Sequence, residues 1–213
     1  MGESCCRNRY PEWMPVSIVV ISLLGFVGLA TGSGIPSVAM LAWLAVFAPA
    51  GGAWMGRWAR APQAWAPALC WALYLLLFGG IPSPFQASVA ILGLYAVGMG
   101  MGAWFSPERA AGVALLLACA LSLAPTLGGA LERPWPPTVT ARLLDLSPVA
   151  LAAESGGVDW MRHPAVYDAA GTADIGPELR SGKRSWLAAT ALLVLGCLCS
   201  LLARTRTSER SEA

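Results

Sequence analysis

The segment from Phe85 to Phe105, FQASVAILGLYAVGMGMGAWF, decides the fold of this chain, because it has the length of a membrane span and contains no charged residue. It belongs to one of four long blocks that lack Asp, Glu, Lys and Arg. These blocks are 13–56, 61–107, 110–131 and 185–203. A charge at the centre of a bilayer is costly, so long apolar runs without charge are typical of segments that cross lipid. The sequence therefore predicts an integral membrane protein.

The overall composition leads to the same class of protein. The chain has 213 residues, of which 56% are hydrophobic and 12% are charged, whereas a soluble domain carries about 25% charged residues. The formal net charge of +2 gives no indication of nucleic-acid binding. Strands that alternate apolar and polar residues are absent, and backbone groups in lipid must be paired internally. We expect an all-α, polytopic membrane helical bundle with the lipid bilayer as its surroundings.

The apolar blocks divide into six expected transmembrane helices. Turn-rich sequences at 31–36 and 79–84 split the first two blocks, and a span needs about 20 apolar residues. The expected spans are 14–30, 37–56, 63–78, 85–105, 108–127 and 186–203. Pro125 lies near the end of the fifth span, where we expect it to end or kink the helix.

The short connections carry a clear charge asymmetry. Arginines lie before the first span, between spans two and three, between spans four and five, and after span six. They are Arg7, Arg9, Arg57, Arg60, Arg109, Arg204, Arg206 and Arg210. The opposite connections, around Gly34 and Pro82, contain no Lys or Arg. The positive-inside rule then predicts that both termini are cytoplasmic, in a multi-pass protein of the inner (plasma) membrane whose first span is an uncleaved signal-anchor.

A long polar segment separates spans five and six, and the chain divides accordingly. Residues 1–131 form helices one to five, residues 132–184 form an extracytoplasmic loop, and residues 185–213 form helix six and a cytoplasmic tail. Two short helices are expected in the loop, at 140–146 and 148–155. The apolar side chains of the first suit the membrane interface, where amphipathic helices and Trp are favoured.

The densest group of polar and aromatic residues in the loop follows these helices. Its members, which we regard as candidate ligand or partner contacts, are Asp159, Trp160, Arg162, His163 and Asp168. Asp159 and His163 are one helical turn apart, a spacing that metal sites use. The simpler interpretation is a surface helix capped by Asp159 and ended before Pro164. We adopt the simpler interpretation, so no metal, cofactor or catalytic residue is predicted.

Apart from Glu108 at the very start of the fifth span, the expected spans contain no acidic residue and no histidine. A proton-coupled transporter with a buried carboxylate and an intramembrane hydrolase are both disfavoured for this reason. The phosphate-binding motif G-x-x-x-x-G-K-[ST] is also absent, so any ATP hydrolysis belongs to a partner chain. Gly98 and Gly102 form a small-xxx-small pair that predicts close helix packing, with Gly100 on a different face. A dimer interface and a flexible gate are the alternatives for this pair.

Several loose motifs occur in a fixed order in the last third of the chain. They are Leu127-Gly-Gly-Ala-Leu131, Pro134-Trp-Pro-Pro137, Leu146-Ser-Pro148, the segment 150–154, and Arg204-Thr-Arg206 after the last span. The chain resembles the permeases of exporter-type (type-2) ABC transporters in the order of these motifs and in its six-span topology. The resemblance of the motifs covers roughly 80 residues. The resemblance implies a separate cytoplasmic ATPase and a homo- or heterodimer with another membrane subunit. Arg57 and Arg60 would then be the candidate docking residues for the ATPase.

Two features differ from that family and keep other functions open. Few residues precede the first span, and the connection between spans two and three is only Arg57-Trp-Ala-Arg60 and its neighbours. The main alternative is a non-catalytic structural or assembly subunit of a larger membrane complex. The substrate-binding subunit of an energy-coupling-factor importer and a membrane enzyme acting through Asp159, His163 and Asp168 are further alternatives.

Overall fold

The computed structural model describes residues 36–58, 62–78, 80–130, 136–158 and 185–212. Every regular element in these ranges is helical. The elements are α2 (Pro36–Met55), η1 (Gly56–Trp58), η2 (Pro62–Trp65), α3 (Ala66–Phe78), α4 (Pro84–Trp104), α5 (Pro107–Ala130), α6 (Pro137–Leu146), α7 (Pro148–Ser155) and α9 (Ser185–Glu212). The prediction of an all-helical fold is therefore confirmed for the described ranges.

Proline begins most of these helices. It is the first residue of α2, α4, α5, α6 and α7. The ring presets a helical φ, and the missing N–H would lack a partner in the first turn in any case. Before α4, Gly80 takes a left-handed φ of 58° that reverses the chain. After α4, Phe105 is extended because the Ser106-Pro107 step disfavours further helix.

The observed boundaries lie close to the expected ones, with a few differences. The third span starts with a 3₁₀ turn, η2, before α3 begins. The last helix continues from the apolar segment to Glu212, well beyond the expected end at residue 203. Helix α5 continues through Pro125 to Ala130. Of the two effects expected of Pro125, an end or a kink, the end is therefore wrong, and the kink stays a prediction. The first expected span, 14–30, lies outside the described residues.

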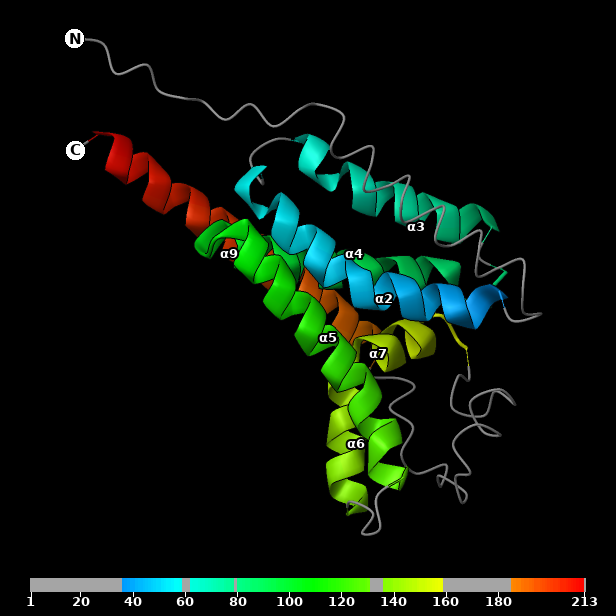
Figure 1. The fold of residues 1–213 in the computed structure, drawn as a ribbon. Coiled ribbons are helices and arrows are strands. Elements are labelled where there is room, and N and C mark those ends of the chain that lie inside the picture. Colours follow the sequence, from blue (N-terminus) through cyan, green and yellow to red (C-terminus); the bar gives the residue numbers. More distant parts are fainter. Residues whose placement is uncertain (1–35, 59–61, 79, 131–135, 159–184, 213) are drawn as a thin grey trace.

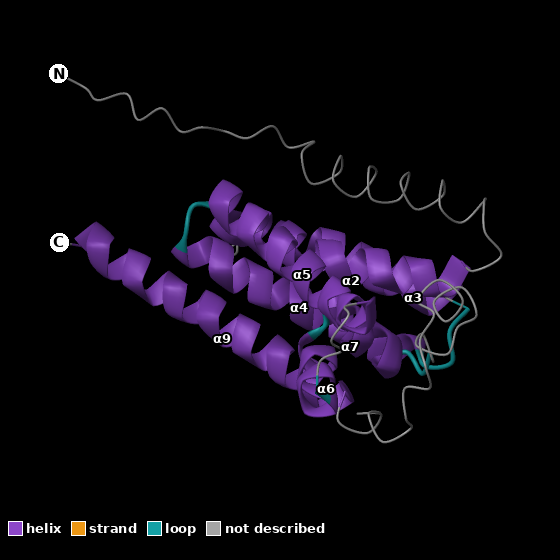
Figure 2. Ribbon diagram, turned by 60° about the horizontal axis from the view of Figure 1, so that its bottom comes forward, coloured by secondary structure: helices purple, strands orange, loops and turns teal. Residues whose placement is uncertain are grey.

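Helix α4 is at the centre of the bundle. It contacts α2, α3, α5, α7 and α9, and Figure 1 shows it behind α2 with α9 and α3 on either side. The short α7 lies against α2, α4 and α9, and the second view also shows it within the group of longer helices (Figure 2). Helix α6 runs across the direction of α2 and α4 in Figure 1.

Among the residues that the structure describes, two helices are long and apolar enough to cross a membrane: α4 and the first 18 residues of α5 (Pro107–Ala124). Shorter apolar segments occupy Ala39–Met55 in α2 and Trp186–Leu202 in α9. Length and composition are the criteria here, and the core helix of a soluble protein meets them too. Within the apolar windows, 67% of the α4 residues but only 22% of the α5 residues are buried.

Candidate functional site

Glycines bring α4 into backbone contact with α2. A Cβ atom on Gly98 would lie 2.7 Å from the carbonyl carbon of Pro49, and one on Gly102 would lie 2.7 Å from that of Ala53. The contact is reciprocal, because a Cβ on Gly52 would lie 2.9 Å from the carbonyl carbon of Tyr95. The pair that the sequence singled out therefore packs against another helix of the same chain. Only glycine fits at these positions without moving backbone atoms.

A second set of small residues brings α4 against α9. A Cβ on Gly93 would lie 2.7 Å from the carbonyl oxygen of Ala189, and one on Gly100 would lie 2.9 Å from the Cβ of Cys199. On α9, a Cβ on Gly196 would overlap the backbone of Ala96. Gly100 thus serves a different face from Gly98, and α4 is closely packed on two sides.

The polar side chains of α4 bond to its neighbours. The Ser88 hydroxyl donates to the carbonyl oxygen of Ala72 on α3 at 3.2 Å and to that of Pro84 at 2.8 Å. The Tyr95 hydroxyl donates to the carbonyl oxygen of Ala64 at 2.6 Å. The indole N–H of Trp104 donates to the carbonyl oxygen of Cys199 on α9 at 3.2 Å. These three side chains connect α4 to α3, η2 and α9.

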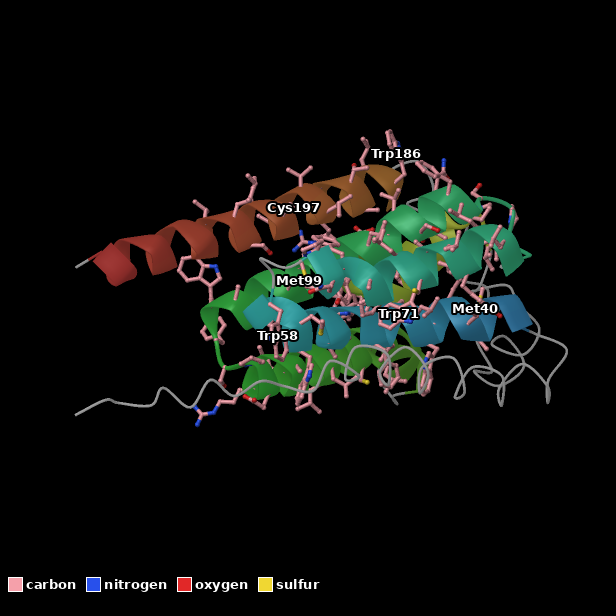
Figure 3. The ribbon with its side chains drawn as sticks, turned by 90° about the horizontal axis from the view of Figure 1, so that it is seen from above. Met40, Trp58, Trp71, Met99, Trp186 and Cys197 are labelled. Atoms are coloured by element: carbon pink, nitrogen blue, oxygen red, sulfur yellow. The ribbon has the colours of Figure 1, made fainter. Side chains whose placement is uncertain are left out.

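Aromatic rings fill the space between α2, α3 and α4. The Trp71 ring stands edge-on to Tyr95, with centroids 6.0 Å apart, and Trp65 lies 6.1 Å from the same tyrosine. Gly51 makes room for Trp71, since a Cβ there would lie 3.2 Å from the indole ring. Figure 3 shows Trp71 directed into the bundle, and Trp186 directed away from it at the start of α9. The indole nitrogen of Trp71 is buried without a hydrogen-bond partner.

The enclosed helix α7 is the most unusual element of the described structure. Seven of its eight residues, all except Glu154, are buried. Ser147 caps its N-terminus by accepting a hydrogen bond from the Ala150 N–H at 3.3 Å. At the other end, the Ser83 N–H donates to the Gly156 carbonyl oxygen at 2.9 Å, which attaches α7 to the start of α4.

The chain leaves α7 through a tight turn against the α3–α4 connection. Gly157 has a φ of 70°, and a Cβ there would lie 3.2 Å from the Cβ of Pro82. The Ser155 hydroxyl is buried and has no hydrogen-bond partner. We regard α7 as the candidate site, together with its flanking residues Ser147, Gly156 and Gly157 and with Ser83, which bonds to Gly156. The sequence analysis did not anticipate its burial, although the small residues of VALAAES were the available signal.

The other predicted site residues are not brought together by the described structure. Asp159, Trp160, Arg162, His163 and Asp168 all lie outside the described residues, and so does Arg60. Arg57 lies in η1, directly after α2. Within the described ranges, no group of three or more His, Cys, Asp and Glu side chains could hold a metal ion.

Comparisons with protein-family models, with curated proteins and with solved structures found no match to this chain.

Proposed function

We propose that the protein is a permease-like membrane subunit of an ATP-driven exporter whose ATPase is a separate chain. It has six transmembrane helices, an extracytoplasmic loop between the last two, and both termini in the cytoplasm of a bacterium.

The outer faces of the helices support a lipid environment. They carry large apolar side chains, whereas a surface helix in water would carry polar ones. The exposed residues are Leu69, Leu73, Leu76 and Leu77 on α3, Val113, Leu116, Leu117 and Leu123 on α5, and Leu187, Val194, Leu195, Leu198, Leu201 and Leu202 on α9. On α5 the buried face is made of alanines at four-residue spacing, Ala110, Ala114 and Ala118. Small residues inside and large ones outside is the arrangement that membrane helices favour.

Exposed aromatic residues at both ends of α4 support the same environment. Phe85 and Phe105 are each 68% exposed. They are separated by 20 residues, or about 30 Å at 1.5 Å per residue, close to the ~30 Å thickness of the hydrocarbon core. Trp104, which is 43% exposed, accompanies Phe105. Aromatic side chains at these two depths are typical of membrane–water interfaces.

The position of the arginines supports the proposed orientation. The ends of α2 and α4 meet where a Cβ on Gly56 would lie 2.6 Å from the Cα of Gly102, and Trp104 bonds to α9 at Cys199. Arg57, Arg109 and the arginine-containing end of α9 all follow these contacts closely in the sequence. The positive-inside rule assigns such an end to the cytoplasm.

The observation that carries the permease function is the order and burial of the elements after α5. A long apolar helix, a short helix α6, a Leu146-Ser-Pro148 step, a buried short helix α7 and a last apolar helix α9 follow one another. The motifs that resemble those of exporter-type permeases lie in these elements, in the same order. The absence of a phosphate-binding motif in the chain agrees with a separate ATPase.

A mild-detergent pull-down of the tagged protein, with mass spectrometry and an ATPase assay on the eluate, tests this function. We expect a co-purifying ATPase whose hydrolysis is lost when its own phosphate-binding lysine is replaced. The double substitution Arg57→Glu, Arg60→Glu should release the ATPase, whereas the matched control Arg109→Glu should retain it. Recovery without any ATPase would contradict the permease function.

A structural or assembly subunit is the second candidate, and the packing of α4 favours it. Backbone contact through glycines on two faces and hydrogen bonds from Ser88, Tyr95 and Trp104 are suited to a rigid scaffold. This candidate predicts that a partner covers residues 159–184 in native membranes. Proteolysis there should be slow in membranes and fast in the purified protein, and equal rates would argue against it.

A further inference from the structure

Helix α6 has a surface that neither the bundle nor the proposed transport function explains. One side of the helix packs on the protein through Leu144, which is buried against Ala150 and Ala153 of α7. Helix α6 also contacts α5, and the exposed surface consists of four of its described side chains. Val139 is 40% exposed, Leu146 is 62% exposed, and both Arg142 and Asp145 are exposed. The question is what covers this open surface.

The open surface is ordered by polarity around the helix axis. At 100° per residue, Val139, Leu143 and Leu146 fall within about 60° of one another. They form an apolar stripe in which Leu143 is half-buried and the other two are exposed. Arg142 follows at about 70° from the centre of the stripe, and Asp145 at about 130°. Leu144 lies on the opposite flank, toward α7. Around the helix axis, the apolar stripe is therefore followed first by the cationic Arg142 and then by the anionic Asp145.

This order matches the layers of a zwitterionic lipid surface. Helix α6 runs across the direction of α2 and α4 in Figure 1, so it lies along the bilayer surface if those helices cross it. The stripe then faces the acyl chains, and the Arg142 guanidinium is at the depth of the phosphates. With side chains at a radius of roughly 5 Å, the Asp145 carboxylate is about 5 Å farther out. An aminophospholipid offers its ammonium group on that outer side of its phosphate.

We propose that α6 binds phosphatidylethanolamine headgroups, with Arg142 contacting the phosphate, Asp145 contacting the ammonium group, and the stripe of Val139, Leu143 and Leu146 contacting the acyl chains. A purely anionic lipid satisfies Arg142 but places no cation near Asp145. A lipid with a quaternary amine presents a cation that cannot donate a hydrogen bond to the carboxylate. This proposal rests on the membrane insertion in the proposed function.

Two measurements on the full chain test the proposal. The first attaches a spin label to single cysteines in a variant whose six native cysteines are replaced, reconstituted in phosphatidylethanolamine–phosphatidylglycerol vesicles. A label at Leu146→Cys should be accessible to oxygen, and one at Asp145→Cys to a water-soluble nickel chelate. Leu116→Cys on α5 reports insertion. A label at Leu116 that is accessible to the nickel chelate would overturn the membrane insertion and the proposal together.

The second measurement compares retained lipids by native mass spectrometry. The unsubstituted protein should retain phosphatidylethanolamine over phosphatidylglycerol, and Asp145→Asn should lower this preference about threefold, the size expected for an exposed ion pair. Glu108→Gln, an exposed acid in the first turn of α5, is the matched control and should leave the preference unchanged. A preference that Asp145→Asn does not alter would overturn the headgroup assignment while leaving insertion intact. The headgroup assignment would also be overturned if a label at Leu146 were shielded from both oxygen and the nickel chelate. A protein partner or a second copy of the chain would then cover the stripe.

Discussion

Helices α4 and α5 are both long and apolar enough to cross a membrane, yet they have opposite surroundings. Most of the apolar window of α4 is buried, and its glycines touch the backbones of α2 and α9. Most of the window of α5 is exposed, and a Cβ added to its Gly112 would meet nothing within 4 Å. Hydropathy therefore identifies candidate spans, whereas the positions of small residues decide which of them are packed inside.

The largest effect that would break this comparison comes from a large side chain at the glycine contacts of α4. Gly98→Leu forces α2 and α4 apart, because the new Cβ overlaps the carbonyl group of Pro49. We expect a loss of about 3 kcal/mol or more, at the upper end for overpacked interiors. Thermal unfolding of the purified protein in detergent measures it. Gly112→Leu is the matched control, and an equal loss there would contradict the distinction.

A substitution that removes side-chain volume should also destabilise the protein more in α4 than in α5. Ile91 on α4 is fully buried and Leu116 on α5 is 72% exposed. Ile91→Ala should destabilise by about 2–4 kcal/mol, because it opens a cavity in a packed region. Leu116→Ala should change the free energy of unfolding by less than about 0.5 kcal/mol, as surface substitutions do. Comparable losses for the two variants, measured by unfolding in mixed micelles, would mean that α5 is not lipid-facing.

The hydrogen bond between α4 and η2 should have an intermediate effect. Tyr95→Phe removes the hydroxyl that donates to the Ala64 carbonyl oxygen at 2.6 Å, a bond between buried groups. We expect a loss of about 1–2 kcal/mol, without a change in membrane insertion. Amide hydrogen exchange is the sharper measurement, because the exchange rate should increase more in residues 62–78 than in α9. Uniform exchange throughout the chain would refute a local effect.

The smallest effect is expected at the exposed end of α4. Trp104→Phe removes the bond to the Cys199 carbonyl but keeps an aromatic ring at the proposed interface. Because Trp104 is 43% exposed, water or lipid headgroups can replace the lost partner. The expected change is less than about 0.5 kcal/mol. Trp104→Ala provides the contrast, and we expect it to lower the yield of membrane-inserted protein more than Trp104→Phe does.

Local signals explain why the helix boundaries were largely predictable. Prolines at 84, 107 and 148 start helices because the ring presets φ, and this effect acts within a few residues. The spacing of Gly98 and Gly102 predicted a packed face for the same reason, since residues four apart share a side of a helix. Pro125 was only partly predictable, because helix neighbours can supply partners for the backbone group that a proline leaves free.

The candidate site was much less predictable than the boundaries. The burial of α7 depends on α2, α4 and α9, which are far from it in sequence. The Ser83–Gly156 hydrogen bond joins residues 73 positions apart, and neither residue belongs to a recognisable motif. The predicted contacts around Asp159 and His163 stay predictions, because they lie outside the described residues.

From the sequence alone follow the helical class of the described residues, the approximate start of most described helices and the apolar character of the long ones. These properties depend on composition and on interactions between near neighbours. The packing of the helices sets the remaining features: Gly98 faces Pro49, Gly100 faces Cys199, and α7 is enclosed while α5 is exposed. The physical reason is that lipid and protein interior are equally apolar, so hydropathy cannot tell one from the other. Steric fit between backbones far apart in the sequence makes that distinction.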